Sequence, residues 1–392
     1  MSKLRIAMIA DVAPDPNSGA AGTELALARE LEGLGHDVVT VWGQELRHRV
    51  RHWNLHHLIE QPIEYRRRIR EILAATEIDV LHVNQPAGWL AARYLRRTGW
   101  NGLFVHRSHG FEARMAEVLR TWQRVFPEPR RSVARRWASA ALRPAQSWTW
   151  REIVRRADAH VVSCADCSSY LVRRGARREQ ILVLPQAPPG SFLEAPVQIM
   201  SADRLRRVLC VGQGTFIKGP MVAAEALRLA LERDGLLEAT WVCEESAHRS
   251  IGEMIGPIGA KRLRLLGWRT QRELRDVYDQ HGIFVFASFA EGFGKAFLEA
   301  MARGLCVVST QQGGAKDLID HGVNGVLTPV GDSVAIADAV AELAGDLPRA
   351  VGMSTAARRL ALGSSWLIAA RTLAEFYGSR LEAKRRSGSL KS

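Results

Sequence analysis

Two glutamates separated by seven residues flank a glycine-rich turn in the segment that runs from Ser288 to Gly304, SFAEGFGKAFLEAMARG. The segment follows an apolar run typical of a buried strand, and we expect a helix to begin near Gly294. Free amides at the start of a helix, together with the helix dipole, attract phosphate. Gly292 and Gly294 lack side chains that would block a close approach. The segment therefore predicts a diphosphate site formed by the backbone from Gly292 through Phe293 to Gly294.

The two carboxylates of this segment have different reach. Glu291 precedes the helix, so it can reach a sugar beyond the diphosphate. Glu299 lies further along the helix by about 1.5 Å per residue, where a carboxylate can accept hydrogen bonds from two ribose hydroxyls. The spacing alone is weak evidence, because glutamates are common on helices and the alternative is two solvated side chains.

A second glycine-containing loop, VGQGTFIKG from Val211 to Gly219, lies between an expected strand and an expected helix. It lacks the third glycine of a dinucleotide-binding fingerprint, and it is not a Walker A loop. As a phosphate loop it would place Lys218 beside the diphosphate. The alternative is a surface lysine in a turn.

The first half of the chain contains a histidine and a glycine that suit the same chemistry. His109 follows an expected strand in the segment VHRSHGFE, where His106 is a competing candidate and Glu112 could hold the imidazole in place. A lone histidine is usually structural. Gly19 belongs to a loop, NSGAAG, whose amides could approach a diphosphate, with a simple tight turn as the alternative.

The ordered run from 288 to 327 resembles the signature of the large retaining glycosyltransferase family 4. After Glu291-x7-Glu299 the run continues with the three segments GLCVVST, GGAKDLI and HGVNGVL. The resemblance implies an α/β protein of GT-B fold, with two Rossmann-like β/α/β domains facing across a cleft. It also implies transfer of a sugar, of the hexosyltransferase type, from a nucleoside-diphosphate sugar with retention of configuration, and no metal or other cofactor is expected.

By this resemblance the catalytic residues are His109, Glu291 and Lys218, with His109 touching the donor sugar. The residues implied in donor binding are Gly19, Gln213, Gly292, Phe293, Gly294 and Glu299. Gln213 departs from the family, which usually has Arg there, and a neutral amide cannot replace that charge. Asp317, where the family often has Glu, would bond near the phosphate or sugar.

Strands alternating with helices are expected throughout, which implies parallel sheets. The predicted strands are 4–10, 38–41, 79–83, 103–105, 159–163, 181–184, 208–211, 239–243, 263–266, 283–287, 306–310 and 325–327. The first helix is expected at 23–34. Prolines at 185, 188 and 189 predict a linker. We therefore expect an acceptor-binding domain at 1–185, a nucleotide-sugar-binding domain at 190–365, and a last helix at 366–380 that returns to the first domain.

The 392 residues exceed one ordinary core, and there is no apolar stretch long enough to span a membrane. The apolar start is interrupted by Asp11, so we expect a buried strand and a cytoplasmic protein. Five cysteines in so long a chain predict no disulfide framework, and Cys164 and Cys167 are interpreted as small residues at a strand-to-helix turn.

The net charge of +13 is concentrated in one stretch, since residues 114–156 contain eleven arginines and three glutamates, a difference of +8. Four tryptophans lie in the same stretch. A lipid-linked or cell-envelope glycan acceptor, at the anionic inner face of a membrane, would suit such a surface. The alternative is a charge-rich helical pair with tryptophans in the core.

Three other functions stay open at this point. Gln213 leaves room for an inactive nucleotide-sugar-binding subunit. The basic 114–156 stretch suggests a nucleic-acid-binding protein, although no reader motif is found and no nucleic acid is expected as a partner. A GT-B epimerase or phosphorylase is the third, but no pyridoxal lysine site is recognisable.

Overall fold

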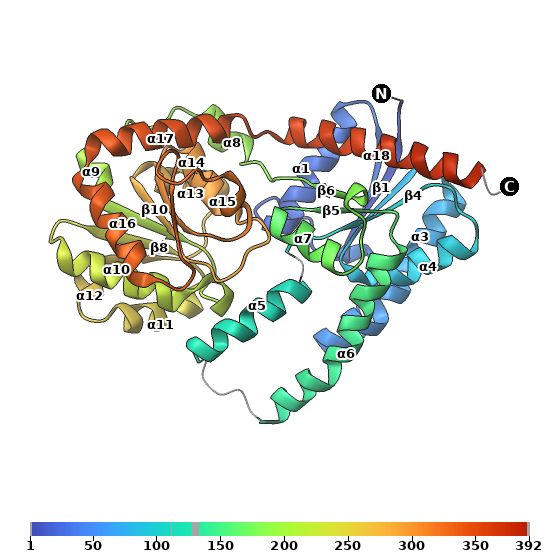
Figure 1. The fold of residues 1–392 in the computed structure, drawn as a ribbon, viewed down its shortest axis with the longest axis horizontal. Coiled ribbons are helices and arrows are strands. Elements are labelled where there is room, and N and C mark those ends of the chain that lie inside the picture. Colours follow the sequence, from blue (N-terminus) through green and yellow to red (C-terminus); the bar gives the residue numbers. More distant parts are fainter. Residues whose placement is uncertain (1, 111, 128–132, 390–392) are drawn as a thin grey trace. The chain divides into compact units, whose positions relative to one another are not determined.

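The computed structural model describes residues 2–110, 112–127 and 133–389, and no side chains are described for residues 53, 112, 113, 133–141, 260, 388 and 389. The chain divides into two compact units (Figure 1). The first contains 1–117, 129–185 and 366–392, and the second contains 118–128 and 186–365. The units change between Pro185 and Gln186, at the start of the proline-rich segment. We predicted that residues 118–127 belong to the first domain, whereas the structure groups them with the second unit.

A six-stranded parallel sheet forms the centre of the first unit, in the order β2-β1-β3-β4-β5-β6. Its strands are β1 (Arg5–Ala10), β2 (Asp37–Trp42), β3 (Val80–Asn84), β4 (Leu103–Arg107), β5 (Ala159–Val162) and β6 (Ile181–Val183). Its helices are α1 (Gly19–Gly33), α2 (Trp53–Leu55), α3 (Gln61–Ala75), α4 (Trp89–Arg97), α6 (Val133–Arg156), α7 (Ala165–Arg173) and α18 (Trp366–Ser389), and a π-helical turn, η2 (His56–Glu60), joins α2 to α3. Short 3-10 turns are η1 (Gly43–Glu45), η3 (Pro86–Gly88) and η4 (Arg178–Gln180). Helix α5 (Glu112–Val125) begins in this unit and ends in the other.

The second unit repeats this plan with a parallel sheet in the order β12-β11-β10-β7-β8-β9. Its strands are β7 (Arg207–Val211), β8 (Glu238–Val242), β9 (Leu263–Leu266), β10 (Ile283–Phe286), β11 (Cys306–Thr310) and β12 (Val326–Thr328). Its helices are α8 (Gly190–Glu194), α9 (Ala202–Leu205), α10 (Pro220–Arg233), α11 (Glu245–Ile255), α12 (Gly259–Arg262), α13 (Gln271–Asp279), α14 (Lys295–Ala302), α15 (Gly313–Leu318), α16 (Ser333–Gly345) and α17 (Leu347–Leu362), with a 3-10 turn η5 (Phe216–Lys218).

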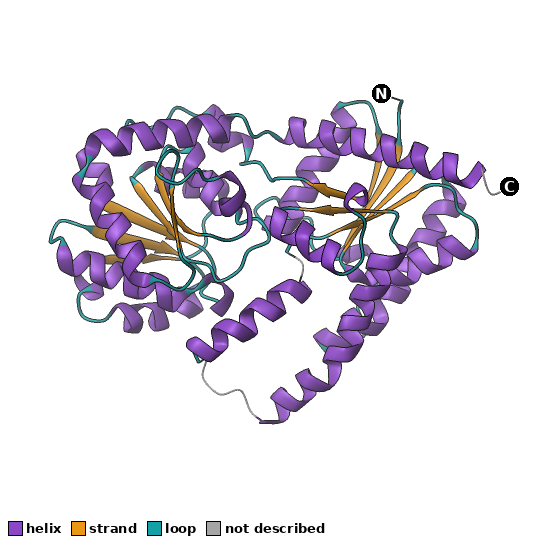
Figure 2. Cartoon of the chain, viewed as in Figure 1, coloured by secondary structure: helices purple, strands orange, loops and turns teal. Residues whose placement is uncertain are grey.

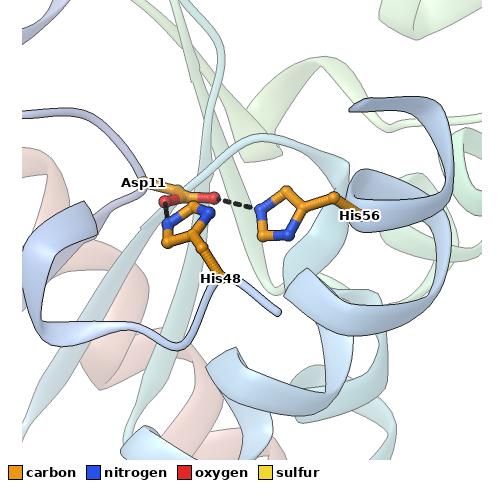
Figure 3. A group of neighbouring side chains, drawn as sticks. All are labelled: Asp11, His48 and His56. Carbon is orange, nitrogen blue, oxygen red and sulfur yellow. Dashed lines mark hydrogen bonds and ion pairs between the residues drawn. The ribbon is translucent and has the colours of Figure 1, made fainter. Parts of the chain in front are cut away.

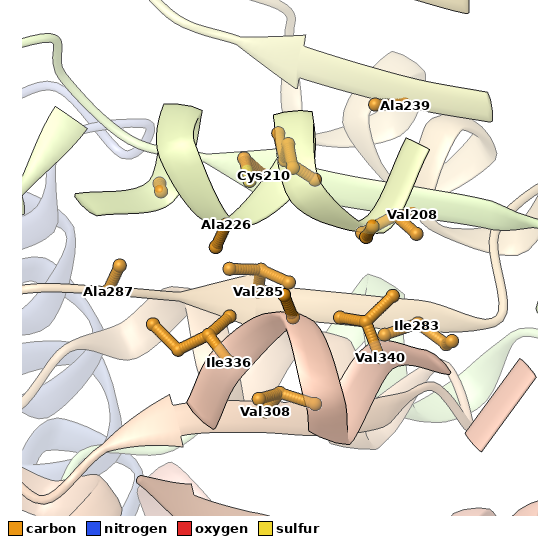
Figure 4. Packing of buried hydrophobic residues seen from close by; sticks show 14 of the residues in the cluster. Val208, Cys210, Ala226, Ala239, Ile283, Val285, Ala287, Val308, Ile336 and Val340 are labelled. Carbon is orange, nitrogen blue, oxygen red and sulfur yellow. The ribbon is translucent and has the colours of Figure 1, made fainter. Parts of the chain in front are cut away.

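Helices cover both faces of each sheet, as the alternation of buried side chains requires (Figure 2). In the second unit Ile283 and Val285 belong to one apolar cluster, while Phe284 and Phe286 belong to the cluster on the opposite face. Figure 4 shows the first of these clusters, in which Ile336 of α16 packs over the strands. Such sheets place their carboxyl ends at one edge, where ligands bind in folds of this kind.

All twelve predicted strands are present, with ends that differ by no more than two residues. The prediction for the first helix was wrong at its start, because α1 begins at Gly19 rather than at Thr23. Ser18 caps the helix, and its hydroxyl accepts a hydrogen bond from the amide of Ala21 at 3.4 Å. Gly19 therefore lies in the first helical turn and not in a loop.

All five cysteines are buried and none is part of a disulfide bond, in agreement with the prediction of no disulfide framework. Cys164 and Cys167 lie between β5 and α7, with their sulfur atoms 3.4 Å apart. No helix in the described part of the chain is long and apolar enough to cross a membrane.

Candidate functional site

The loop after β7 is held against the end of β10 by one glycine. Gly219 has φ +63°, and a Cβ there would lie 2.3 Å from the carbonyl oxygen of Ala287, so a side chain cannot be accommodated. The amide of Phe289 donates to the carbonyl of Ile217 at 2.9 Å. These contacts fix Lys218 beside the loop that follows β10, although the two loops are far apart in sequence.

Lys218 and Glu291 form an ion pair at this position. The Nζ atom of Lys218 lies 2.7 Å from Oε1 of Glu291, and the hydroxyl of Ser288 donates to the same oxygen at 2.6 Å. Glu291 is buried and Lys218 is partly exposed. Gly313 has φ +56° and no room for a Cβ, which would lie 2.6 Å from the Cβ of Glu291. The sequence predicted both charged residues, and the structure shows that they are partners.

Helix α14 begins where the sequence predicted, with Gly294 as its N-cap at φ +87°. A Cβ on Gly294 would lie 2.7 Å from the ring of Phe286, so the turn requires glycine. The preceding residues contribute backbone only. Gly292 has no side chain, and the ring of Phe293 is buried beside Phe297, at 5.5 Å between centroids. The predicted contact of Phe293 with a donor can therefore be made by its backbone and not by its ring.

Glu299 lies on α14 with its carboxyl group buried. The hydroxyl of Tyr278 donates to Oε2 of Glu299 at 3.4 Å. Burial raises the pKa of Glu299, and Lys295 and Tyr278 oppose this only in part. The alternative of a solvated glutamate is therefore wrong. Tyr278 was not identified from sequence, because it lies on α13 and nothing in its neighbours marks it.

The glycine loop after β7 is less open to phosphate than its sequence suggests. Gln213 is exposed and lines a small hollow together with Lys218 and Ser288. The amide of Gly214, however, already donates to both carboxylate oxygens of Glu244, at 3.0 and 3.1 Å. A second anion at that amide would be repelled, so the loop offers the side chains of Gln213, Thr215 and Lys218 as its polar groups.

In the first unit the two histidines near the end of β4 have different surroundings. His106 lies within the strand and is completely buried, with its Nδ1 3.2 Å from Nδ1 of His160. His109 lies beyond the strand end, and its Nε2 is 3.0 Å from Oε1 of Glu24. Burial is the main cause that lowers the pKa of His109, so its imidazole is neutral at neutral pH. The side chain of Glu112, predicted to orient His109, lies outside the described residues.

Glu24 is the centre of a buried polar cluster that the sequence did not indicate. Its carboxylate lies 3.2 Å from Nε2 of His82 and 3.6 Å from Nε of Arg107. His82 in turn contacts the hydroxyl of Tyr377 on α18. Burial by itself would raise the pKa of Glu24, but His82 and His109 outweigh it and hold that pKa well below its usual range. Glu24 therefore stays ionised and fixes the position of His109.

Two other predicted residues, Gly19 and Asp317, are exposed. Gly19 opens α1, and a Cβ there would meet nothing within 4 Å, so its surface is open. Asp317 is exposed on α15.

The basic stretch forms parts of α5 and α6, and residues 128–132 lie outside the described chain. Trp122 stacks on Phe289 at 5.0 Å, and Trp150 is buried in the core of the first unit. Trp148 is partly exposed against Trp89, and the side chain of Trp137 is not described. Both Trp122 and Phe289 belong to the second unit.

Two family models match the chain in succession. Residues 18–187 match the family described as Glycosyltransferase Family 4, and residues 206–346 match Glycosyl transferases group 1. The chain belongs to glycosyltransferase family 4. The second match contains Lys218, Glu291 and Glu299, and the first contains Glu24 and His109.

Curated relatives of this chain are also named as glycosyltransferases. The D-inositol 3-phosphate glycosyltransferase of Corynebacterium diphtheriae is 28% identical over 322 residues, which cover 76% of this chain and 70% of the relative. The amylovoran biosynthesis glycosyltransferase AmsK of Erwinia amylovora is 34% identical over 138 residues, covering 33% of this chain and 34% of the relative.

Solved structures confirm the predicted GT-B fold of this glycosyltransferase. The sucrose-phosphate synthase of Thermosynechococcus elongatus has a TM-score of 0.73 at 19% identity, covering 97% of this chain and 100% of that chain. Anabaena HepE in complex with UDP and glucose has a TM-score of 0.67 at 17% identity, covering 96% and 100% of the two chains. At these identities the likeness concerns the fold alone.

Proposed function

We propose that this glycosyltransferase moves a hexose from a nucleoside-diphosphate sugar to a phosphorylated acceptor, with retention of anomeric configuration. The observation that carries the proposal is the Lys218–Glu291 pair beside the start of α14, at 2.7 Å between Nζ and Oε1. A cation, a fixed carboxylate and a helix N-terminus are together at the carboxyl end of a parallel strand, where such folds bind ligands.

The leaving diphosphate requires stabilisation as the bond to the sugar breaks. The ammonium of Lys218 and the first amides of α14 would supply it as preorganised charge and dipoles, and we propose that no metal takes part in this step. Glu291, held by Ser288 and Lys218, would accept hydroxyls of the sugar. Glu299 would accept the ribose hydroxyls. The resemblance to retaining enzymes supports front-side attack, in which the departing phosphate takes the acceptor proton.

His109 would contact the donor sugar. Its neutral imidazole is fixed through Nε2 by Glu24 at 3.0 Å. Its Nδ1 has no hydrogen-bond partner among the described residues, so this atom would be the one that meets a sugar hydroxyl. In this arrangement His109 contacts the substrate and Glu24 positions His109.

A phosphorylated acceptor suits the charge of the chain, which is +13 overall. Several curated relatives are named for an acceptor that carries a phosphate, D-inositol 3-phosphate. A lipid-linked or cell-envelope glycan would present the same group at an anionic membrane surface. We therefore propose that the protein acts in the cytoplasm, at the inner face of the membrane when the acceptor is lipid-linked.

Purified protein mixed with UDP-, GDP- and ADP-sugars in a thermal-shift screen tests the donor. We expect one nucleotide series to raise the melting temperature, and the paired acceptor reaction to give a product whose anomeric configuration matches the donor by NMR. An inverted product would overturn retention. Absence of both binding and turnover with all the nucleotide sugars would overturn the donor assignment.

Gln213 supports a second candidate, a nucleotide-sugar-binding subunit without turnover. The residue is exposed in the phosphate loop and has no charge where the family usually has Arg. Slow hydrolysis of the bound donor in the absence of acceptor would exclude this candidate, because an inactive subunit hydrolyses nothing. Salt-sensitive binding of single-stranded or duplex nucleic acid would instead support the nucleic-acid alternative.

A further inference from the structure

A polar cluster in the first unit contains none of the residues assigned to the transfer reaction. Asp11 directly follows β1, and two histidines from the segment after β2 approach its carboxylate (Figure 3). Nε2 of His48 lies 3.0 Å from Oδ1, and Nε2 of His56 lies 3.0 Å from Oδ2. One ligand-type atom from each of the three residues lies within 4.8 Å of the others.

His56 lies between two carboxylates, which restricts the protonation states of its ring. The Nδ1 atom of His56 lies 2.8 Å from Oε2 of Glu60, so a neutral ring donates its proton there. Nε2 then presents a lone pair to Oδ2 of Asp11, and two acceptors face each other at 3.0 Å. A cation between them, or a second proton on the ring, is needed to make this contact favourable.

Glu60 fixes both histidines through hydrogen bonds from outside the cluster. Its two oxygens accept hydrogen bonds from the backbone amides of Arg49 at 2.8 Å and Val50 at 3.0 Å, directly after His48 in the chain. A carboxylate that binds the far nitrogen of a histidine, and so fixes its tautomer and orientation, is the usual second layer of a protein metal site. His56 and Glu60 lie on the π-helical turn η2, a rare conformation that is frequent at functional sites.

Asp11 is also fixed by a hydrogen bond. The side-chain amide of Gln61 donates to its Oδ2 at 2.7 Å, and the side chain of Asp11 is 4% exposed. His56 is buried as well, whereas the side chain of His48 is 48% exposed. Two fixed ligands and one at the surface leave a path for an ion to enter and a position open to solvent.

We propose that Asp11, His48 and His56 form a binding site for one divalent transition metal ion, with Glu60 as its second layer. Two imidazole nitrogens and one carboxylate oxygen suit Zn²⁺ and its neighbours, whereas Mg²⁺ and Ca²⁺ prefer oxygen ligands alone. With metal bonds of about 2.0–2.1 Å, tetrahedral ligands lie about 3.3 Å apart. The two 3.0 Å contacts use different oxygens of Asp11, and the rings of His48 and His56 are stacked at 4.3 Å between centroids, so metal binding requires the exposed His48 ring to turn.

None of the residues of this cluster is among those assigned above to the transfer step, for which no metal is proposed. The cluster lies at the carboxyl edge of the first sheet, close in sequence to the start of α1. The ion would use its open position to bind water or an anionic oxygen.

Zinc titration of the tag-free protein, read by competition with a chromophoric chelator, tests the proposal without donor or acceptor. We expect one Zn²⁺ per chain, and Co²⁺ should give the visible spectrum of a nitrogen- and oxygen-bound site. His48→Ala, which removes a surface ligand, should weaken zinc binding at least about tenfold. Glu60→Gln should weaken it by about 10- to 100-fold, as second-layer changes do.

His52→Ala is the matched control, because His52 is exposed on the same segment and does not belong to the cluster. It should bind zinc like the wild type, and thermal melts of all variants confirm folding. Equal zinc binding by wild type and His48→Ala, or no stoichiometric binding by the wild type, would overturn the proposal. The cluster would then be a doubly protonated His56 between Asp11 and Glu60. Because no sugar nucleotide is present, this outcome leaves the proposed transfer reaction untouched.

Discussion

The two units place charged groups at the same edge of similar sheets but hold them differently. In the second unit Lys218 and Glu291 pair where the lysine is partly exposed, so a ligand can compete for its charge. In the first unit Glu24 is buried among His82, Arg107 and His109. A pair near solvent can exchange partners during a reaction, whereas a buried cluster keeps one geometry because an unpaired charge there is costly. The second unit therefore contains a pair that a ligand can reach, and the first contains a cluster with a fixed geometry.

The largest effect should come from the exposed pair. Lys218→Ala removes a cation from the proposed leaving-group site and should lower turnover about 10²- to 10³-fold, the usual cost of losing one group that stabilises a transition state. Steady-state transfer rates measure it. Lys261→Ala changes the same charge at an exposed position of α12 and should leave turnover unchanged. Similar rates for both variants would contradict the assignment of Lys218.

A mutation in the buried cluster around Glu24 should mainly lower the stability of the folded chain. Glu24→Gln leaves neighbouring polar groups without their charge partner and should lower the free energy of unfolding by about 3 kcal/mol in urea titrations. Glu32→Gln, exposed on the same helix, is the control and should change little.

The difference in the free energy of unfolding between wild type and Glu24→Gln should depend on pH in one direction. The lowered pKa of Glu24 means that its ionised form stabilises the folded chain above the ordinary carboxyl pKa of about 4.3, and that this contribution is lost as the pH falls further. The gap between wild type and Glu24→Gln should therefore persist from about pH 8 to about pH 5 and narrow below that. A gap that grows on acidification would show that Glu24 is not held ionised.

Glu299 is buried like Glu24, but like Lys218 it is proposed to bind the donor. Glu299→Gln should weaken nucleotide binding about tenfold by calorimetry, since it loses a charged hydrogen-bond acceptor. Its raised pKa means that ionisation opposes folding as the pH rises. The variant should therefore melt at a higher temperature than wild type at about pH 7, with a smaller gain at about pH 4. Glu253→Gln, exposed on α11, should change neither property.

The smallest effect is expected for Gln213, in the exposed loop after β7. Gln213→Arg adds a cation at a solvated position and should strengthen donor binding about two- to fivefold, with a gain that falls as salt is added. Gln311→Arg adds the same charge at another exposed position and should not change affinity. An unchanged affinity for Gln213→Arg at low salt would show that the residue does not face the diphosphate.

Local sequence predicted the strands well because a parallel sheet buried on both faces needs short, continuous apolar runs. It predicted the start of α14 for a similar reason, since Gly294 lies within the same segment as the helix it caps. The start of α1 was misjudged because glycines at positions 19 and 22 suggested a loop, and the cap by Ser18 outweighed them.

What the sequence determined by itself was the fold class and the local structure of the segment from Ser288 to Gly304, because turn, helix start and both glutamates lie within one short stretch of chain. Only the tertiary structure decided their partners. Lys218 meets Glu291, His109 meets Glu24, and the hydroxyl of Tyr377 on α18 completes the cluster around Glu24 through His82. Contacts between residues so far apart in the chain depend on the packing of whole elements, and the spacing of residues along the sequence does not predict them.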